Sequence, residues 1–367
     1  MSATPLGDKL TQLGARRGEF CGLETALCFT DPRPEFISLL HGCGVYDLGW
    51  RACFTIAGRD RGRWLNAMLT NNLRDLPPGH GNYNFLLTAQ GHIQGDMYVY
   101  NCGEDFVAVT ERPQLEHILK TLRKHIIMDQ VELTDLDRQL TAIGVQGPRA
   151  GERLRGAEFA GAFPEIAALT EISWHGRGFS LARRAGPGFP AYEVWMPPAE
   201  APGVWDALTA AGAAPVGVEA LEMFRVAAGI PRYGADIRER DLPQETGQMH
   251  ALHFAKGCYI GQEIVERIRS RGNVHRTFTG FEIEGVLPAP GANVQASGKD
   301  AGEITSAQRV PLPEDGGWAA LALGYVRREN AAAGSVLQAG QAMARITSLP
   351  FDSILPRPAM SQAKLEP

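Results

Sequence analysis

The sequence lacks the features that mark membrane-spanning, exported and nucleotide-binding proteins. No run approaches the roughly 18 uninterrupted apolar residues that a membrane span needs, and the opening stretch "MSATPLGDKLTQLGARRGEF" has no apolar centre like that of a signal peptide. No P-loop, GxGxxG, GxSxG or EF-hand motif occurs. The formal net charge of -5 provides no overall basic field. We therefore expect no membrane partner, and the charge argues against nucleic acid as a partner.

Cysteine is scarce and irregularly spaced. The six cysteines form no CxxC pair and no regular framework; they are Cys21, Cys28, Cys43, Cys53, Cys102 and Cys258. Such usage is typical of reduced thiols rather than of disulfides. The sequence therefore predicts a cytoplasmic protein.

The pattern of apolar residues predicts an α+β protein. The segment "GNYNFLLTAQGHIQGDMYVYN" predicts two strands around a turn at residues 89–91, and "PQLEHILKTLRKHI" predicts a helix with Leu115, Ile118, Leu119 and Leu122 on one face. After residue 275 the chain becomes a series of short strands separated by glycine and proline, which favours a small antiparallel barrel. A chain of 367 residues has room for two or three such domains.

The segment "AKGCYIGQEIVERIRSRGNV", residues 255–274, combines a lone cysteine with many charges. Helical spacing allows Glu263 to face Arg267, and Glu266 to reach Arg269. Cys258 precedes the expected helix and Lys256 stands two residues before it, and both features favour the thiolate over the thiol. The alternative is a small buried apolar residue, the usual environment of a single free cysteine.

No metal site is predicted. His250 and His253 form an H-x-x-H pair just before this segment, but no CxxC or HExxH motif accompanies them.

Two acids interrupt otherwise apolar strands: Asp96 in "IQGDMYVY" and Glu193 in "AYEVWM". A carboxylate in such a strand is costly unless it faces solvent, a partner or a ligand. A solvated strand edge explains each acid, while a cavity carboxylate that accepts two parallel N–H bonds from an aminopyrimidinone edge would explain both. Tyr83 is expected on the hairpin strand beside Asp96.

The octapeptide "KGCYIGQE", residues 256–263, resembles the signature of the YgfZ-type folate-binding proteins, K-G-C-Y-x-G-Q-E. These proteins belong to the superfamily of the glycine cleavage T protein, the aminomethyltransferase. Further blocks follow in the order that the superfamily uses, including "GVYDLGWRACFTIAGRD", "AIGVQGPRA", "FRVAAGIPRYGADI" and the terminal "LALGYVR". The resemblance covers nearly the whole chain.

This resemblance implies three small domains around a central cavity that holds tetrahydrofolate or a folate derivative. Residues 1–274 would form the folate-binding region from two intertwined subdomains, residues 275–359 the small barrel, and residues 360–367 a tail. Asp96 matches the aspartate beside the folate nitrogens, Tyr83 the tyrosine before that hairpin, and Glu193 the glutamate that holds the pterin. The residues expected to carry the chemistry are Cys258, Lys256 and Asp96; those expected to hold the folate are Tyr83, Asp96, Glu193, Tyr259, Gln262, Glu263 and Arg267.

Several positions depart from the transferase pattern. The transferase's "SH" is Gly49-Trp50 here, and its "GYTGEDGFE" loop has become "AGPGFPAYE". Its "G-x-x-A-R" arginine is Leu221, and its "RxEA" acid is Ala227. The cysteine octapeptide, which the transferase lacks, favours the YgfZ branch.

The main hypothesis is therefore a folate-dependent factor for assembly or repair of iron–sulfur clusters, with Cys258 as a reactive thiol at the mouth of the cavity. Its partners would be iron–sulfur client or assembly proteins. The alternative is a folate-dependent aminomethyl or one-carbon transferase in which Asp96 steers protonation. Whether the chain is an enzyme remains open at this point, and so does a third hypothesis, an accessory to RNA modification that uses the arginine run.

Overall fold

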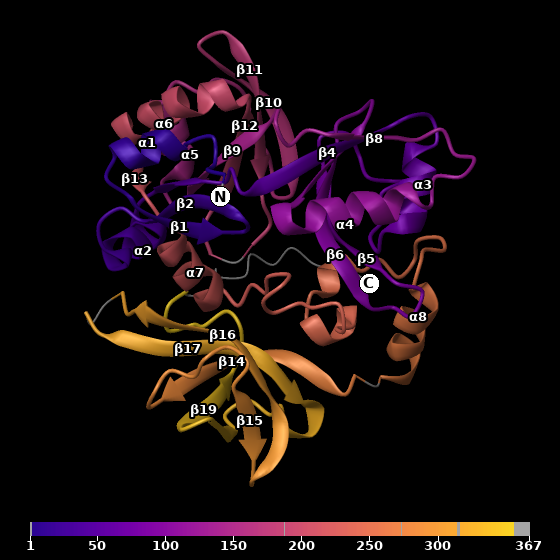
Figure 1. The fold of residues 1–367 in the computed structure, drawn as a ribbon, viewed down its shortest axis with the longest axis vertical. Helices are drawn as coiled ribbons and strands as arrows, with labels where there is room; N and C mark the ends of the chain where they lie inside the picture. The colour runs from indigo at the N-terminus through magenta and orange to yellow at the C-terminus, as the bar shows by residue number, and fades with distance from the viewer. Residues whose placement is uncertain (1, 187, 273, 314–315, 356–367) are drawn as a thin grey trace.

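The computed structural model describes residues 2–186, 188–272, 274–313 and 316–355. Two open sheets with their helices form the upper part of the molecule in Figure 1, and a barrel lies below them. This is an α+β fold with a closed antiparallel C-terminal barrel, as the sequence predicted. The expected tail at 360–367 lies outside the described residues. None of the helices in the described ranges combines the length and apolar character that crossing a bilayer requires.

A five-stranded sheet carries the predicted hairpin. Its strands, in spatial order, are β5 (Gly81–Leu87), β6 (Ile93–Asn101), β7 (Phe106–Glu111), β4 (Arg51–Ala57) and β8 (Glu132–Asp135). Gly91 adopts φ 78° in the β5–β6 turn, a conformation that glycine adopts without strain. Helices α3 (Arg61–Met68) and α4 (Arg112–Arg123) pack against this sheet. All four predicted apolar positions of α4 are buried, which confirms that helix.

A six-stranded sheet forms the second layer. Its strands, in spatial order, are β10 (Ala168–Trp174), β11 (Arg177–Arg183), β12 (Ala191–Met196), β9 (Thr141–Gln146), β3 (Gly44–Asp47) and β13 (Ala214–Pro215). A separate hairpin pairs β1 (Arg16–Phe20) with β2 (Leu23–Cys28). The remaining helices of this region are α1 (Gly7–Gln12), α2 (Pro32–His41), α5 (Ala150–Gly156), α6 (Ala201–Ala210) and α7 (Val218–Ala227).

The barrel closes on itself through six antiparallel strands. In spatial order these are β14 (Arg276–Glu284), β17 (Trp318–Arg327), β16 (Lys299–Pro311), β15 (Asn293–Ala296), β18 (Val336–Ala339) and β19 (Ala342–Thr347). Small and β-branched side chains fill most of its interior, together with Phe281 and Leu337. Helix α8 (Gln262–Arg271) precedes the barrel and lies at the outer edge of the molecule (Figure 1). Short 3₁₀ turns cover Pro198–Glu200, Pro243–Thr246, Met249–Ala251 and Arg328–Asn330.

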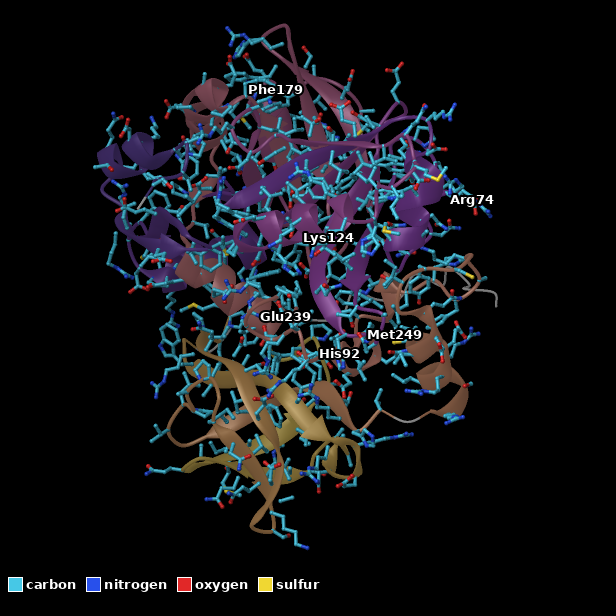
Figure 2. The ribbon with its side chains drawn as sticks, turned by 45° about the vertical axis from the view of Figure 1, so that its right-hand side comes forward. Arg74, His92, Lys124, Phe179, Glu239 and Met249 are labelled. Carbon is cyan, nitrogen blue, oxygen red and sulfur yellow. The ribbon has the colours of Figure 1, made fainter. Side chains whose placement is uncertain are left out.

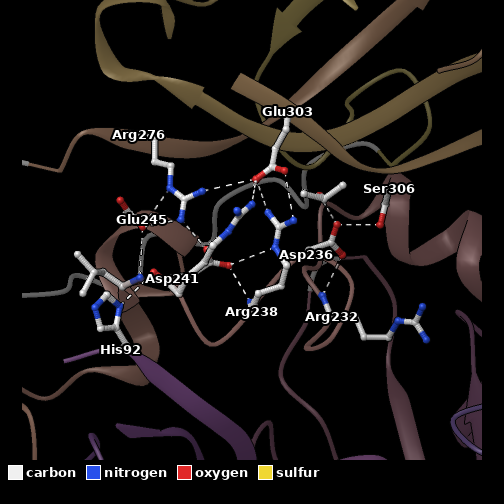
Figure 3. Close-up of polar contacts among 12 residues, drawn as sticks. His92, Arg232, Asp236, Arg238, Asp241, Glu245, Arg276, Glu303 and Ser306 are labelled. Carbon is white, nitrogen blue, oxygen red and sulfur yellow. Dashed lines mark hydrogen bonds and ion pairs between the residues drawn. The ribbon is translucent and has the colours of Figure 1, made fainter. Parts of the chain in front are cut away.

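A network of ion pairs joins the barrel to the segment after α7 (Figure 3). Asp241 is fully buried and accepts a hydrogen bond from Arg276 of β14 at 2.5 Å. Arg238 and Arg240 both donate to Glu303 of β16. Figure 2 places His92 and Glu239 at the level of this junction. Breaking one partner of such a buried set leaves a charge uncompensated, so the network holds the barrel in one position.

Candidate functional site

A cavity of about 290 Å³ lies where the two sheets face α7. Strands β4, β6 and β7 contribute one wall, β12 a second, and α7 with residues 230–233 a third. Aromatic rings dominate the apolar part of the lining; they are Phe20, Tyr46, Trp50, Tyr83, Tyr98, Phe189, Phe224 and Tyr233. A concave, largely apolar site with a few converging polar groups is the usual form of a small-molecule site.

Asp96 of β6 lies in the wall of this cavity, and both of its carboxylate oxygens are hydrogen-bonded. The Tyr83 hydroxyl donates to Oδ2 at 2.5 Å, and Gln114 Nε2 donates to Oδ1 at 2.9 Å. Gln114 also accepts from the backbone amide of Asp96 at 3.0 Å, which fixes the strand against α4. Removal from water raises the pKa of Asp96, although the bonds from Tyr83 and Gln114 oppose this. Asp96 therefore takes up a proton more readily than a free aspartate.

Glu193 of β12 lies in the same cavity and has the opposite character. Arg51 and Arg184 both donate to its Oε1, and the Trp195 indole donates to Oε2 at 3.2 Å. Burial alone would raise the pKa of Glu193, but the two guanidinium groups outweigh burial and lower it. Arg184 also lies over the ring of Tyr98, 3.9 Å from its centroid. Glu193 is thus held ionised.

The hydrogen bonds to Glu193 limit what it can offer a ligand. An ionised carboxylate has about four acceptor positions, and three are occupied here. One position on Oε2 remains, so Glu193 can accept one N–H from a ligand in this geometry. The two parallel bonds expected from the sequence would require Arg51 or Arg184 to move.

The cavity holds one of the two histidines considered as a metal pair. His250 lines the cavity and stacks on Tyr83 with ring centroids 5.5 Å apart, and burial lowers its pKa. His253 is not part of the lining; its amide donates to the carbonyl of Thr70. Within the described ranges no three His, Cys, Asp or Glu side chains are grouped to hold a metal.

The structure does not bring the octapeptide to the cavity. Cys258 is exposed and is not among the cavity-lining residues. Nζ of Lys256 donates to the carbonyls of Leu69 and Asn71 at 2.6 and 2.5 Å, and burial lowers its pKa to about 7. The lysine fastens its loop to the chain after α3, and its expected support of a thiolate at residue 258 stays a prediction.

The other residues of the octapeptide also lie outside the cavity lining. Tyr259 is buried against Phe85, Leu87 and Ile93, farther along β5 than Tyr83. Gln262 accepts from the Tyr259 amide at 3.3 Å and so closes the turn into α8. Glu263 and Arg267 are exposed on α8 and belong to no cavity wall. The packing of Tyr259 explains this placement, because it seats the whole loop beyond the end of the cavity. Folate contacts by these four residues stay untested predictions.

Seven acidic, basic or histidine residues of the cavity lining were not singled out as ligand contacts from the sequence: Arg51, Glu111, Arg184, Glu222, Arg225, Arg232 and His250. Arg51 lies at the start of β4 and Arg184 just after β11. A charged side chain at the end of a strand is normally expected to be solvated. Because a buried acid in an apolar strand requires a partner, Glu193 did indicate that basic side chains would lie close to it. Nothing local identified which of the 36 lysines and arginines they were.

The chain is similar to known aminomethyltransferases in sequence and in fold. Residues 6–256 match the family model described as the GCVT N-terminal domain. The chain is 31% identical over 353 residues to an aminomethyltransferase of Rubrobacter xylanophilus, which covers 95% of this chain and 93% of that protein. It is 28% identical over 363 residues to an aminomethyltransferase of Thermus thermophilus, covering 96% and 99%. The crystal structure of glycine cleavage system aminomethyltransferase T from Bartonella henselae superposes with a TM-score of 0.87 at 20% identity, covering 96% of this chain and 99% of that one.

Proposed function

The chain belongs to the GCVT N-terminal domain family of the aminomethyltransferases, and from that premise we propose that it binds tetrahydrofolate in the cavity and transfers a one-carbon unit there. One observation carries the proposal: two acids line a single cavity with opposite partners, Glu193 bound by two guanidinium groups and Asp96 held by the neutral donors Tyr83 and Gln114. These partners lower the pKa of Glu193, whereas burial raises that of Asp96. This difference in pKa suits Glu193, a permanent anion, to ligand recognition and suits Asp96, which can be protonated, to proton transfer.

The cavity residues fit a reduced pterin by shape and by donor–acceptor chemistry. The free position on Glu193 Oε2 accepts one N–H from the pyrimidine edge, while aromatic side chains such as Tyr98 and Trp50 flank the ring. Arg184 and Arg51 stay paired with Glu193, and their remaining N–H groups are available to carbonyl oxygens of the ligand. The folate supplies the nitrogen atoms that carry the one-carbon unit.

The protein's own part in the reaction is positioning and proton transfer. Tyr83 and Gln114 hold the Asp96 carboxyl in one orientation, so that it exchanges a proton with a nitrogen bound beside it. The apolar walls exclude bulk water, which strengthens each of these electrostatic interactions.

The test is Asp96→Asn, assayed for one-carbon transfer to tetrahydrofolate from an aminomethylated lipoyl-carrier protein. We expect transfer to fall by about 10²- to 10⁴-fold, the usual contribution of a positioned acid or base, while tetrahydrofolate affinity changes only a few-fold. Asp300→Asn on the barrel surface, where the side chain is 60% exposed, is the matched control and should leave both unchanged. Transfer at the wild-type rate by Asp96→Asn would contradict the proposal.

A second candidate rests on Cys258. Its exposure makes the thiol of the YgfZ-like octapeptide available to another protein, and the exposed arginines 267, 269 and 271 of α8 would suit an acidic surface. A thiolate is both a nucleophile and a soft metal ligand, so this loop could serve assembly or repair of iron–sulfur clusters. Cys258→Ser should keep tetrahydrofolate binding and folding but abolish maturation of iron–sulfur enzymes in cells; full maturation would eliminate this candidate.

A further inference from the structure

Besides Asp96 and Glu193, two further acids line the cavity. Glu222 is paired with Arg225, whereas Glu111 has no part in the proposed function above. Glu111 is the last residue of β7, and β7 pairs with β6 through Tyr98 and Val109. Asp96 lies two residues before Tyr98, and Glu111 lies two residues after Val109. Because the strands are antiparallel, Asp96 and Glu111 are neighbours on the same face, and both line the cavity. Glu111 also pairs in register with Arg51 of β4. Arg51, Glu111 and Asp96 therefore form one row across three strands.

The Glu111 carboxyl is the acid in this row that protein groups leave open. Its hydrogen bond within the described residues comes from the thiol of Cys21, at the long distance of 3.6 Å. Asp96, by contrast, accepts at both oxygens, and Arg51 is directed to Glu193. Carboxyl groups that line a cavity with acceptor positions unused are available to a ligand.

Opposing effects from burial and from nearby charged groups determine the protonation of Glu111. Arg232 lies nearby, but its guanidinium stacks over Phe20 at 4.7 Å and contacts the Cys21 sulfur at 3.9 Å. Burial raises the pKa of Glu111 to about 7; Arg232 and Arg51 lower it, while Asp96 and Glu222 raise it further. Burial also raises the pKa of Cys21, so its thiol keeps its proton and acts as a donor to Glu111. A group poised near neutral pH is well suited to exchange protons.

We propose that Glu111 is a second catalytic residue, the group that exchanges a proton with the amine nitrogen of the one-carbon substrate. This inference rests on the proposed function. In the forward direction the C–N bond to the amine breaks with its electron pair going to the amine nitrogen, while the carbon forms a bond to a folate nitrogen. The O–H bond of the protonated Glu111 breaks and an N–H bond forms on the departing amine, which leaves as ammonia, and Glu111 becomes a carboxylate. Arg232 and the Cys21 thiol stabilise that charge. Because Asp96 and Glu111 share one wall, ionisation of one disfavours ionisation of the other.

The experiment compares Glu111→Gln with wild type in the one-carbon transfer assay, from pH 5.5 to 9. The wild type should show an inflection near pH 7. In Glu111→Gln that inflection should disappear and kcat/KM should fall by about 10²-fold or more. Glu111→Asp keeps the acid one methylene shorter, so it should be slower but retain a pH inflection. Glu104→Gln, an exposed glutamate in the β6–β7 turn, is the matched control.

Calorimetric titration with tetrahydrofolate separates the two ways of being wrong. If the wild type binds no tetrahydrofolate, the proposed function fails and this inference fails with it. If the wild type binds and turns over, but Glu111→Gln keeps its rate and its pH profile, only the role of Glu111 is overturned. A uniform loss of rate with the inflection intact would also overturn it, because a purely structural role predicts that result.

Discussion

Replacement of Glu193 by glutamine tests whether the cavity is built around an anion. The substitution keeps the volume and the acceptor for Trp195 but removes the charge that Arg51 and Arg184 share. The Glu193 side chain is 4% exposed, and the two arginines are 18% and 25% exposed. These groups are too buried for water to replace the lost partner fully.

The expected cost follows from these exposures. Breaking a buried ion pair typically destabilises a protein by about 3–5 kcal/mol, because a charge is left uncompensated. Both arginines keep some contact with water and Arg184 keeps its position over Tyr98, so we expect the low end, about 3 kcal/mol. Replacing Arg184 by methionine in the Glu193→Gln background should recover part of this loss, since one unpaired cation is then removed.

Urea unfolding at pH 7, followed by tryptophan fluorescence, measures the change in free energy. The matched control is Glu200→Gln, whose partner Arg177 is 61% exposed; a surface pair of this kind contributes less than about 1 kcal/mol. A cost for Glu193→Gln no larger than for Glu200→Gln would refute the reasoning. The same argument means that Glu193→Ala is a poor probe of ligand binding, because lost stability would be mixed with lost recognition.

Three further predictions concern stability and thiol access. The pKa of Glu111 is raised from 4.5 to about 7 in the folded state, so the folded state holds this proton more tightly than the unfolded state does. The free energy of unfolding is therefore highest below about pH 4.5 and falls as pH rises through about 7. Glu111→Gln should therefore exceed the wild type in stability at pH 8, by about 3 kcal/mol; equal urea midpoints at pH 8 would contradict this. Gly261 has φ 83°, and a Cβ there would lie 2.6 Å from the Thr88 carbonyl oxygen, so Gly261→Ala should cost about 1–3 kcal/mol in thermal unfolding. Gly257→Ala meets no atom within 4 Å and should cost less than about 0.5 kcal/mol; equal losses would show that the turn is not constrained. Cys102 and Cys258 are the exposed cysteines, but burial of its sulfur raises the pKa of Cys102 to about 11 and leaves little reactive thiolate. An aromatic disulfide reagent should therefore label one thiol quickly in the native protein and none quickly in Cys258→Ser; slow labelling of Cys258 would place it in a buried loop.

The sequence predicted the elements whose signals are local. The spacing of Leu115 and Leu122 indicated α4, and Gly91 indicated the β5–β6 turn, because helix faces and hairpin turns depend on neighbours in the chain. The regular strands after residue 275 indicated the barrel. Asp96 and Tyr83 were placed together for the same reason, since a hairpin brings its two strands side by side.

The groups that give the cavity its charge are brought together by tertiary packing and could not be predicted in this way. Arg51 and Glu193 are 142 positions apart, and their strands belong to different sheets. Nothing in the sequence indicated that Lys256 lies over the ring of Tyr259 and donates to two backbone carbonyls of the chain after α3. Sequence distance along a loop does not determine where a long side chain points.

The most direct test of the central claim is calorimetric titration of the protein with tetrahydrofolate, repeated on Ala191→Trp. Ala191 lines the cavity on the same face of β12 as Glu193, so an indole there should fill the site. The matched control, Gly178→Trp on β11, adds the same ring where no atom lies within 4 Å of the new Cβ. The account predicts one-to-one binding by the wild type and Gly178→Trp, and a loss of at least about tenfold in affinity for Ala191→Trp. Absence of binding by the wild type, or unchanged affinity with the cavity filled, would contradict it.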